Sequence, residues 1–287
     1  MDRKNFLKKL ALGAAGTIGI AATAQHKGES RDLQSATEDA TQRLGFNHIP
    51  QQQNPSKMKT ILHKASTRGQ ADHGWLKSHH SFSFANYYNP ERMNFGALRV
   101  LNDDRVAAGR GFGTHPHDNM EIISIPLSGD LEHKDSMGNT AVIKEGDVQV
   151  MSAGTGVYHS EYNRNADQEV AFLQIWVFPN KRDVRPRYDQ ISLNEVRRKN
   201  AFYQILSPKA DDQGVWIHQN AWFNLGEFDQ GHGESYILND TQNGLYLFLL
   251  EGEIEVAGQR LEKRDAIGIW DTSVIELSAI DASRVLL

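Results

Sequence analysis

The pattern of apolar and polar residues changes near residue 58, and from there to the end of the chain it favours β-strands. Short runs of β-branched and aromatic residues recur about every 8–12 residues, separated by turn sequences such as Ser128-Gly129-Asp130. Strands are predicted over residues 95–102, 121–127, 141–143, 147–151, 158–162, 170–178, 200–207, 215–219, 222–228, 244–250, 252–256, 266–270 and 274–277. No helical pattern of about 10–15 residues alternates with them, which excludes parallel α/β folds. The chain is therefore predicted to be an all-β sandwich or barrel.

A weak internal repeat divides this region into two halves. Residues 127–130 form a strand end and a glycine turn, and a charged turn at 145–148 enters another strand; residues 250–253 and 263–266 repeat the arrangement. Between the halves, residues 179–194 contain two prolines and many charges that interrupt the strands. Two similar barrels in tandem are predicted, over residues 58–185 and 186–287.

The first 24 residues resemble a secretory signal peptide. Four basic residues against one acid precede an uncharged stretch, Leu10–Gln25, in which Ala22-Thr23-Ala24 has the small-x-small cleavage pattern. Arg3–Lys8 also resembles a relaxed twin-arginine signal with lysine in place of the second arginine. The alternative is an amphipathic or unstructured tail on a cytoplasmic protein. The 16 uncharged residues are fewer than the roughly 20 of a spanning helix, so no membrane span is predicted.

Residues 25–57 have no clear periodicity, and the run Gln51–Ser56 is typical of a polar linker. Met58 is a possible alternative start, which would remove the signal. We therefore expect an exported, periplasmic protein if the leader functions, and a cytoplasmic one if it does not or if translation starts at Met58.

The amino-acid composition excludes several kinds of functional site. The chain has 287 residues and no cysteine, which excludes disulfides, thiolate metal sites and cysteine nucleophiles. Its formal net charge of −5 gives no basic surface for nucleic acid. Any metal must therefore be bound by nitrogen and oxygen donors, which suit iron, manganese, nickel, cobalt, copper or zinc.

Two pairs of candidate ligands stand out among the histidines. They are His115-Pro116-His117 and His159-Ser160-Glu161. Residues i and i+2 of a strand point to the same face, so each pair directs two ligand groups into a barrel interior. Three imidazoles and one carboxylate can hold one metal and leave two positions of an octahedral ion open. An H-x-H pair alone is a weak motif, because 12 histidines make one such spacing common by chance.

The frame around these pairs strengthens the assignment. Gly109-x5-His115-x-His117-x3-Glu121 resembles the first cupin motif, and Gly146-x7-Gly154-x4-His159-x3-Asn163 approximates the second. Longer segments resemble the pirin family of bicupins, most closely its bacterial quercetin 2,3-dioxygenase-like members. These segments are Arg68–Asp104, Gly113–His117, His133–Asn139 and Gly154–Glu161. The resemblance covers about residues 58–287, strongly to residue 190.

The resemblance implies two tandem cupin barrels of the double-stranded β-helix, or jelly-roll, type. It implies that His115, His117, His159 and Glu161 bind the metal and that Glu121 does not. Glu121 then stays a candidate neighbour of a ligand imidazole, as does His133, although a hairpin turn explains His133 equally well. The family's second barrel usually lacks metal, and residues 246–255 contain no histidine. Trp176, Phe178, Trp216 and Trp222-Phe223 are predicted to be packing residues.

The activity implied by the resemblance is oxidative cleavage of a flavonol such as quercetin, with release of carbon monoxide. The expected cofactor is a divalent metal, Fe(II) by default, and the expected partners are a small aromatic substrate and dioxygen, in a monomeric protein. The metal would lower the pKa of the flavonol 3-hydroxyl, and Glu161 is the candidate catalytic base for that proton, provided that it can loosen from the metal. Two alternatives stay open: a non-enzymatic iron-binding regulatory protein that senses redox state, and a cupin isomerase or binding protein.

The leader generates a first prediction. The basic start followed by Leu10–Ala24 predicts a mature protein that begins at or near Gln25 outside the inner membrane. Cell fractionation and N-terminal sequencing of the native protein check it. A cytoplasmic protein that begins at Met1 or Met58 would contradict it.

Overall fold

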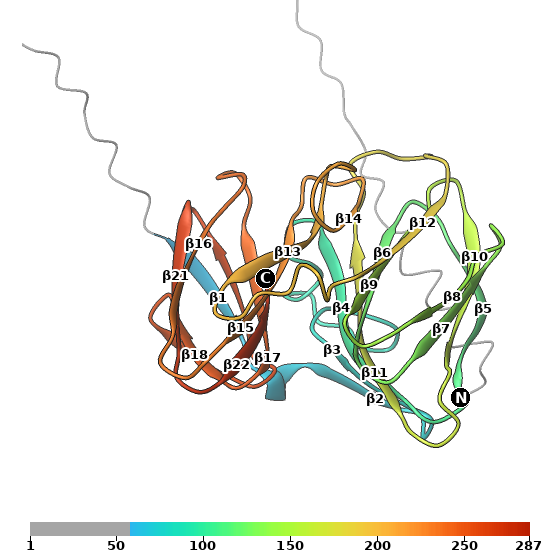
Figure 1. Cartoon of the computed structure of the whole chain (residues 1–287), viewed down its shortest axis with the longest axis horizontal. Helices are drawn as coiled ribbons and strands as arrows, with labels where there is room; N and C mark the ends of the chain where they lie inside the picture. The colour runs from blue at the N-terminus through green and yellow to red at the C-terminus, as the bar shows by residue number, and fades with distance from the viewer. Residues whose placement is uncertain (1–57) are drawn as a thin grey trace, which may run out of the picture.

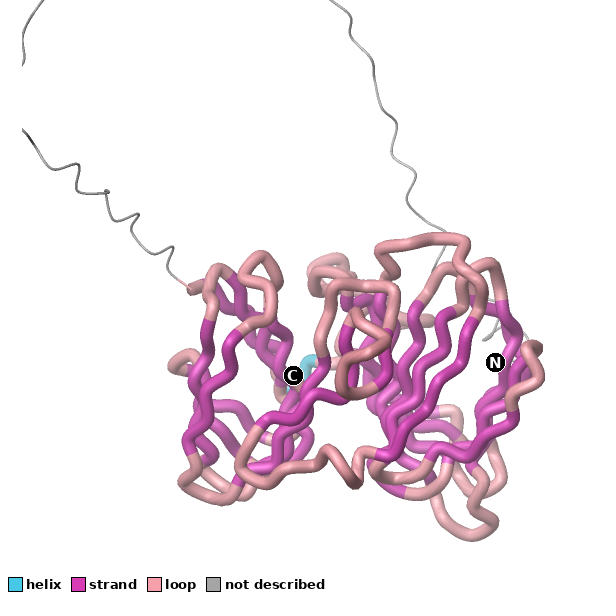
Figure 2. Tube along the Cα trace, turned by 45° about the horizontal axis from the view of Figure 1, so that its top comes forward, coloured by secondary structure: helices cyan, strands magenta, loops and turns pink. Residues whose placement is uncertain are grey.

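The computed structural model describes residues 58–287, which form two β-barrels side by side (Figures 1 and 2). Strands dominate, and the only helix in this part of the chain is the 3-10 turn η1, Ala65–Thr67. The fold class predicted from the sequence is therefore confirmed. No helix of the described residues is long and apolar enough to cross a membrane. The predicted leader, residues 1–24, and the linker, 25–57, lie outside the described residues.

The N-terminal barrel consists of two antiparallel sheets. The larger has the strand order β12-β9-β6-β11-β4-β3-β2 and the smaller the order β5-β10-β7-β8. The strands are β2 Gly69–Asp72, β3 Leu76–His80, β4 Leu98–Val106, β5 Gly111–His117, β6 Glu121–Ser128, β7 Leu131–Asp135, β8 Thr140–Ile143, β9 Asp147–Ser152, β10 Val157–Asn163, β11 Val170–Val177 and β12 Arg187–Ser192.

The C-terminal barrel repeats this arrangement. Its sheets have the orders β1-β20-β17-β22-β15-β13-β14 and β16-β21-β18-β19. The strands are β1 Lys59–His63, β13 Phe202–Ser207, β14 Val215–Trp216, β15 Phe223–Phe228, β16 Gly233–Ile237, β17 Leu245–Glu251, β18 Glu253–Val256, β19 Gln259–Glu262, β20 Ala266–Trp270, β21 Val274–Ala279 and β22 Ser283–Leu286. Aliphatic side chains fill its interior.

Strand pairing differs in two places from the division at residues 185/186. The first strand, β1, pairs with β20 and so belongs to the C-terminal barrel, as its blue colour among red strands shows (Figure 1). The segment expected to connect the barrels contains β12, which pairs with β9 of the N-terminal barrel. Pro179 and Pro186 precede β12 and leave its ladder intact, because proline is excluded only from positions that must donate.

The large sheet of the N-terminal barrel is buried on both faces, and β11 illustrates how. All eight residues of β11 are buried. Phe172 and Trp176 point into the barrel interior, whereas Leu173, Ile175 and Val177 point toward the other barrel. This alternation makes the sheet a shared wall between the site and the interface.

The faces of the two large sheets that look toward each other form one apolar core. Side chains such as Ile123, Val150 and Ile175 from the N-terminal barrel pack in one cluster with Ile205, Phe248 and Leu286 from the C-terminal barrel. Burying this surface is the main attraction between the barrels.

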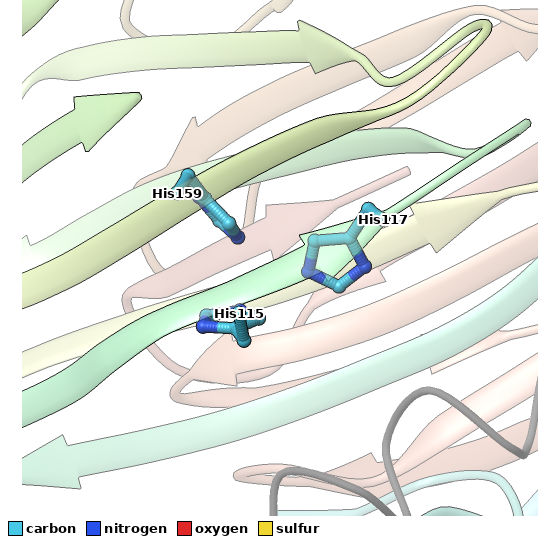
Figure 3. A group of neighbouring side chains, drawn as sticks. All are labelled: His115, His117 and His159. Carbon is cyan, nitrogen blue, oxygen red and sulfur yellow. The ribbon is translucent and has the colours of Figure 1, made fainter. Parts of the chain in front are cut away.

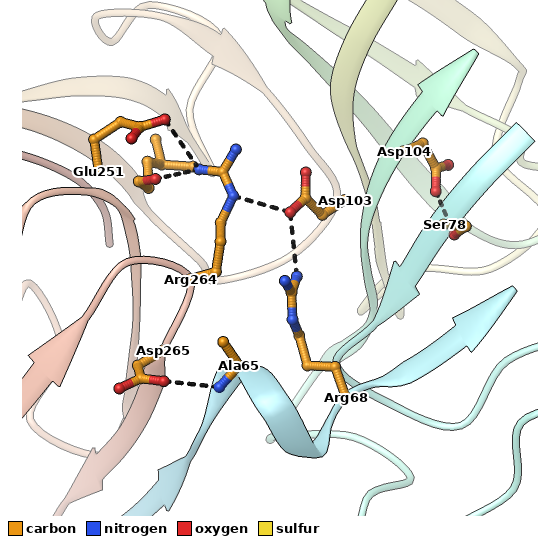
Figure 4. A network of polar contacts seen from close by, with 9 residues as sticks. Ala65, Arg68, Ser78, Asp103, Asp104, Glu251, Arg264 and Asp265 are labelled. Atoms are coloured by element: carbon orange, nitrogen blue, oxygen red, sulfur yellow. Dashed lines mark hydrogen bonds and ion pairs between the residues drawn. The ribbon is translucent and has the colours of Figure 1, made fainter. Parts of the chain in front are cut away.

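A polar network joins the barrels beside this core (Figure 4). Asp103 of β4 accepts hydrogen bonds from Arg68 Nη1 at 3.3 Å and from Arg264 Nε at 2.9 Å. All three side chains are nearly buried, with 9%, 7% and 12% exposed respectively. Asp103 therefore neutralises two guanidinium groups that come from opposite barrels.

The network generates a stability prediction. Asp103→Ala should lower the free energy of unfolding by about 3–5 kcal/mol, because it leaves the buried Arg68 without a counter-charge and Arg264 with only the more distant Glu251, at 3.9 Å. Urea denaturation measures the change. The matched control is Glu169→Ala. It removes the partner of Arg105, which lies on β4 like Asp103, but both side chains of this ion pair are half exposed. The control should lower the free energy of unfolding by less than about 1 kcal/mol. Equal losses in the two variants would contradict the role assigned to Asp103.

Candidate metal centre

Two antiparallel neighbours in the small sheet, β5 and β10, hold the histidine cluster. His115 lies directly opposite His159 in this pairing. Because side chains alternate along a strand, His117 points to the same side as His115, and Glu161 to the same side as His159. Figure 3 shows the three imidazoles turned toward a common space. Among the described residues, His115, His117 and His159 form the group whose potential ligand atoms all lie within 4.8 Å of one another.

Burial keeps these imidazoles neutral. Burial, followed by the nearby His115, lowers the pKa of His117 to about 3, and burial also lowers the pKa of His115 and moves that of His159 well below its ordinary value. A neutral imidazole has a free nitrogen lone pair, which is the form that binds metal.

The hydrogen bonds of the cluster fit a metal. His115 Nδ1 lies 2.8 Å from the carbonyl oxygen of Gly113, so this nitrogen donates and Nε2 keeps its lone pair. His159 is 2% exposed, and neither of its ring nitrogens has a hydrogen-bond partner. A buried polar group without a partner is costly unless something else binds it. A divalent cation shared by the three imidazoles would satisfy His159.

Glu161 lies in the wall of the same cavity but is held by other groups. Its Oε1 accepts a hydrogen bond from the hydroxyl of Ser124 at 3.0 Å, and its Oε2 accepts one from Nε2 of Gln174 at 2.7 Å. The group within 4.8 Å does not include its carboxylate. The structure therefore places Glu161 beside the imidazoles, and its role as the fourth ligand stays a prediction.

His133 contacts the cluster through its ring. The ring centre lies 5.3 Å from that of His159, and Nε2 lies 3.0 Å from Oδ2 of Asp135. Asp135 also accepts from the backbone nitrogen of Met137, which closes the β7–β8 turn. Both interpretations of His133 therefore agree with the structure. Its ring lies against the imidazole of His159, and its hydrogen-bond partner, Asp135, belongs to a hairpin turn.

Glu121 was expected to lie beside a ligand imidazole, but the structure places it outside the metal cavity. It is in phase with Ile123 on β6 and faces the other barrel, where its Oε2 accepts a hydrogen bond from Ser152 at 2.6 Å. Burial raises its pKa, while bonds from Ser152 and the backbone of His218 oppose that rise. The two-residue period that groups His115 with His117 turns Glu121 away from the metal cavity.

Sequence reasoning missed several residues that line the cavity. They come from β4 and β11, and they include Asn102, Asp104, Gln174 and Trp176. Trp176, expected to be a packing residue, packs edge-on against His117 at 4.9 Å between ring centres. Burial raises the pKa of Asp104 to about 7, although a hydrogen bond from Ser78 opposes the shift. The polar run 102–104 inside an apolar strand was the available signal.

Family models match both barrels. The model described as Pirin matches residues 62–177, and the model described as Quercetinase C-terminal cupin domain matches residues 204–287. The second match falls on the half where the resemblance seen in the sequence was weaker.

Individual relatives agree with these matches. A quercetin 2,3-dioxygenase of Escherichia coli is 41% identical over 230 residues, which are 79% of this chain and 96% of the relative. A pirin-like protein of Caulobacter vibrioides is 40% identical over 220 residues, covering 76% of this chain and 94% of the relative. The crystal structure of the E. coli pirin YhhW with nickel(II) superposes with a TM-score of 0.75 at 38% identity, covering 79% and 97% of the two chains. The chain therefore belongs to the pirin family of bicupins.

Proposed function

We propose that the protein is a metal-dependent dioxygenase that uses iron(II) to cleave quercetin-type flavonols with release of carbon monoxide. The observation that carries the proposal is the group of three neutral imidazoles, two of them buried and that of His117 partly buried, with a carboxylate beside them. The relative named quercetin 2,3-dioxygenase supports the substrate class, and the nickel(II) bound to YhhW supports a divalent metal.

In this proposal His115, His117, His159 and Glu161 hold the metal. When bound, a divalent ion supplies Lewis acidity toward a hydroxyl oxygen and a route for electrons to dioxygen. Nitrogen and oxygen donors without thiolate suit iron(II). The aromatic and aliphatic residues of the wall, including Ile122 and Trp176, exclude water from the reacting groups.

Glu161 is the proposed base for the flavonol 3-hydroxyl. The hydroxyl of Ser124 has two acceptors within reach, Glu161 Oε1 at 3.0 Å and Gln174 Oε1 at 3.4 Å. When this hydroxyl turns to Gln174 and Glu161 loosens from the metal, Glu161 Oε1 becomes free to take a proton, while Gln174 Nε2 still holds Oε2. Ser124 and Gln174 therefore orient the base without blocking it.

Access to the metal cavity constrains the substrate. The cavity beside the imidazoles has a volume of about 30 Å³, far below the roughly 300–1,000 Å³ of typical small-molecule sites. A flavonol enters only if lining side chains move. Phe84 and Phe112 line the cavity and keep partial solvent exposure, so they mark the opening.

The small cavity also favours a second candidate function, a non-enzymatic iron-binding protein in which the redox state of the metal alters a surface. Oxygen uptake by the iron-loaded protein with quercetin distinguishes the two functions. Uptake matched by carbon monoxide release supports the dioxygenase. No uptake, together with different protease sensitivity of the Fe(II) and Fe(III) forms, supports the regulatory function.

The ligand assignment predicts the metal content of variants. His115→Ala and His159→Ala should each lose the bound metal, because each removes a neutral nitrogen donor from the cluster, while the C-terminal barrel stays folded. Elemental analysis of the purified variants measures the metal, and circular dichroism checks the fold. His232→Ala, which changes a histidine of the C-terminal barrel, is the control and should keep its metal. Full occupancy in both cluster variants would overturn the assignment.

The base assignment predicts the activity of Glu161→Gln. Its turnover of quercetin should fall about 10²–10⁴-fold at every pH, because the amide cannot take the proton. Its metal content should fall little, because the three imidazoles remain. Steady-state kinetics over a pH series measure the effect. Recovery of turnover as the pH rises toward the pKa of the flavonol itself would instead mean that the substrate arrives ionised.

Two variants serve as comparisons for Glu161→Gln. Glu121→Gln makes the same change in a buried carboxylate that also bonds a serine but faces the other barrel, and its turnover should stay near that of the unaltered protein. His133→Ala should lower the turnover of quercetin by at most about 10–100-fold, the range typical of changes in groups that contact a metal ligand. A loss in Glu121→Gln as large as that in Glu161→Gln would remove the base assignment.

A further inference from the structure

A pocket between the barrels is larger than the metal cavity. Its volume is about 450 Å³, within the range of about 300–1,000 Å³ typical of small-molecule sites. Its wall combines residues 95–98 of the N-terminal domain with the loops 219–223 and 238–244 and parts of β16 and β17. Neither the metal nor the proposed dioxygenase chemistry uses this pocket.

The shared sheet separates this pocket from the metal cavity. On β11, Val177 lines the pocket between the barrels, and its neighbour Trp176 lines the metal cavity. On β4, Leu101 and Asn102 divide in the same way. The alternation of side chains therefore gives one sheet two pockets on opposite faces, and a ligand in one does not occupy the other.

The pocket wall is aromatic and amide-rich. Phe95 and Tyr246 pack with their ring centres 5.5 Å apart, and Trp222, Phe223 and Tyr236 also line the space. Several side-chain amides lie among the aromatic rings: Gln219, Asn220, Asn239, Gln242 and Asn243. Such walls accept flat rings, and their amides pair with hydroxyl or carbonyl groups.

The charge of the wall is low. Among the lining side chains of residues 58–287, Asp240 carries the one carboxyl group. Its Oδ1 accepts a hydrogen bond from the backbone nitrogen of Gln242 at 2.9 Å, so this acid is engaged in its own turn. None of the described residues that line the wall is a lysine or arginine that could bind a phosphate or carboxylate. The pocket therefore suits an uncharged ligand.

Tyr236 lines the pocket and has a hydroxyl proton to donate. Its hydroxyl oxygen accepts from Asn224 Nδ2 at 3.0 Å and from Asn239 Nδ2 at 3.2 Å. Both bonds use the oxygen as acceptor, so the hydroxyl proton is left for a third group. Burial raises the pKa of Tyr236, so this proton is retained at neutral pH.

The loops around the pocket are held in place before any ligand arrives. Asn243 Nδ2 donates to the carbonyl oxygen of Asn220 at 2.9 Å, which ties the loop 238–244 to the loop 219–223. The backbone nitrogen of Asn220 in turn donates a hydrogen bond to Oε1 of Gln219 at 2.8 Å. A preformed pocket loses little conformational entropy when it binds a ligand.

We propose that the pocket between the barrels is a second small-molecule site, which binds a flat, uncharged aromatic compound through ring contacts and through a hydrogen bond from Tyr236 to a carbonyl or hydroxyl oxygen of the ligand. The site is distinct from the metal centre, and its occupation does not depend on the metal.

The test uses flavone as the probe. Flavone is flat and uncharged and has one carbonyl oxygen, but it lacks the adjacent hydroxyl that would chelate a metal. Isothermal titration calorimetry with the full chain should give saturable binding with one site per chain. His115→Ala should bind flavone as tightly as the unaltered protein, because the shared sheet lies between the two cavities.

Two variants of the pocket should weaken binding. Tyr236→Phe removes one hydroxyl and should raise the dissociation constant about five- to tenfold. Ala221→Trp fills the space and should abolish binding. The matched control is Tyr88→Phe, the same change at a tyrosine that is 73% exposed, and its dissociation constant should not change. If thermal melting shows that Ala221→Trp is unfolded, the dissociation constants of Tyr236→Phe and Tyr88→Phe still test whether flavone binds in this pocket.

Three results would overturn the proposal. They are no saturable binding of flavone by the unaltered protein, equal binding by Tyr236→Phe and Tyr88→Phe, and loss of flavone binding in His115→Ala. The last result would place the probe in the metal cavity.

Discussion

The burial of both faces of the large N-terminal sheet is the constraint on which the rest of the structure depends. Strands β4, β6 and β11 present one set of side chains to the metal cavity and the other to the second barrel. A shift of one residue in any of these strands would exchange the two sets, so the interface between the barrels also fixes which residues reach the metal cavity. The second barrel thus serves the site without contributing a ligand to the histidine cluster. The polar contact of Asp103 with Arg68 and Arg264 adds a directional element to an otherwise apolar interface.

The parts of the fold that could be predicted are those in which local pattern and final burial agree. The β-branched run near Ile123 and the apolar run 170–178 became β6 and β11, at the centre of the shared wall. The two pairs with i, i+2 spacing predicted the neighbouring positions of His115, His117 and His159, because the geometry of a strand fixes that spacing. Glu161 could be placed in the cavity by the same rule, but not its partners Ser124 and Gln174, which come from other strands.

What could not be predicted depends on contacts distant in the sequence. The strands β7 and β19, with the sequences LEHKD and QRLE, have few apolar residues and become strands through pairing with neighbours. Nothing local in β1 says that it joins β20, more than 200 residues away in the chain. The expectation for Glu121 followed a family motif rather than the alternation of its own strand, in which Ile123 and Ile125 already indicated the opposite face. Asp104 and Trp176 face the metal cavity only because β4 and β11 lie side by side in the sheet.

The central claim is that three imidazoles on β5 and β10 bind the protein's metal in the N-terminal barrel. Anomalous diffraction from crystals of the protein purified with its own metal tests it most directly, because the signal locates the ion without assumptions about its ligands. The account predicts one strong peak at about 2.1 Å from a ring nitrogen each of His115, His117 and His159. A peak elsewhere, for example at His133 and Asp135 or in the C-terminal barrel, would contradict it.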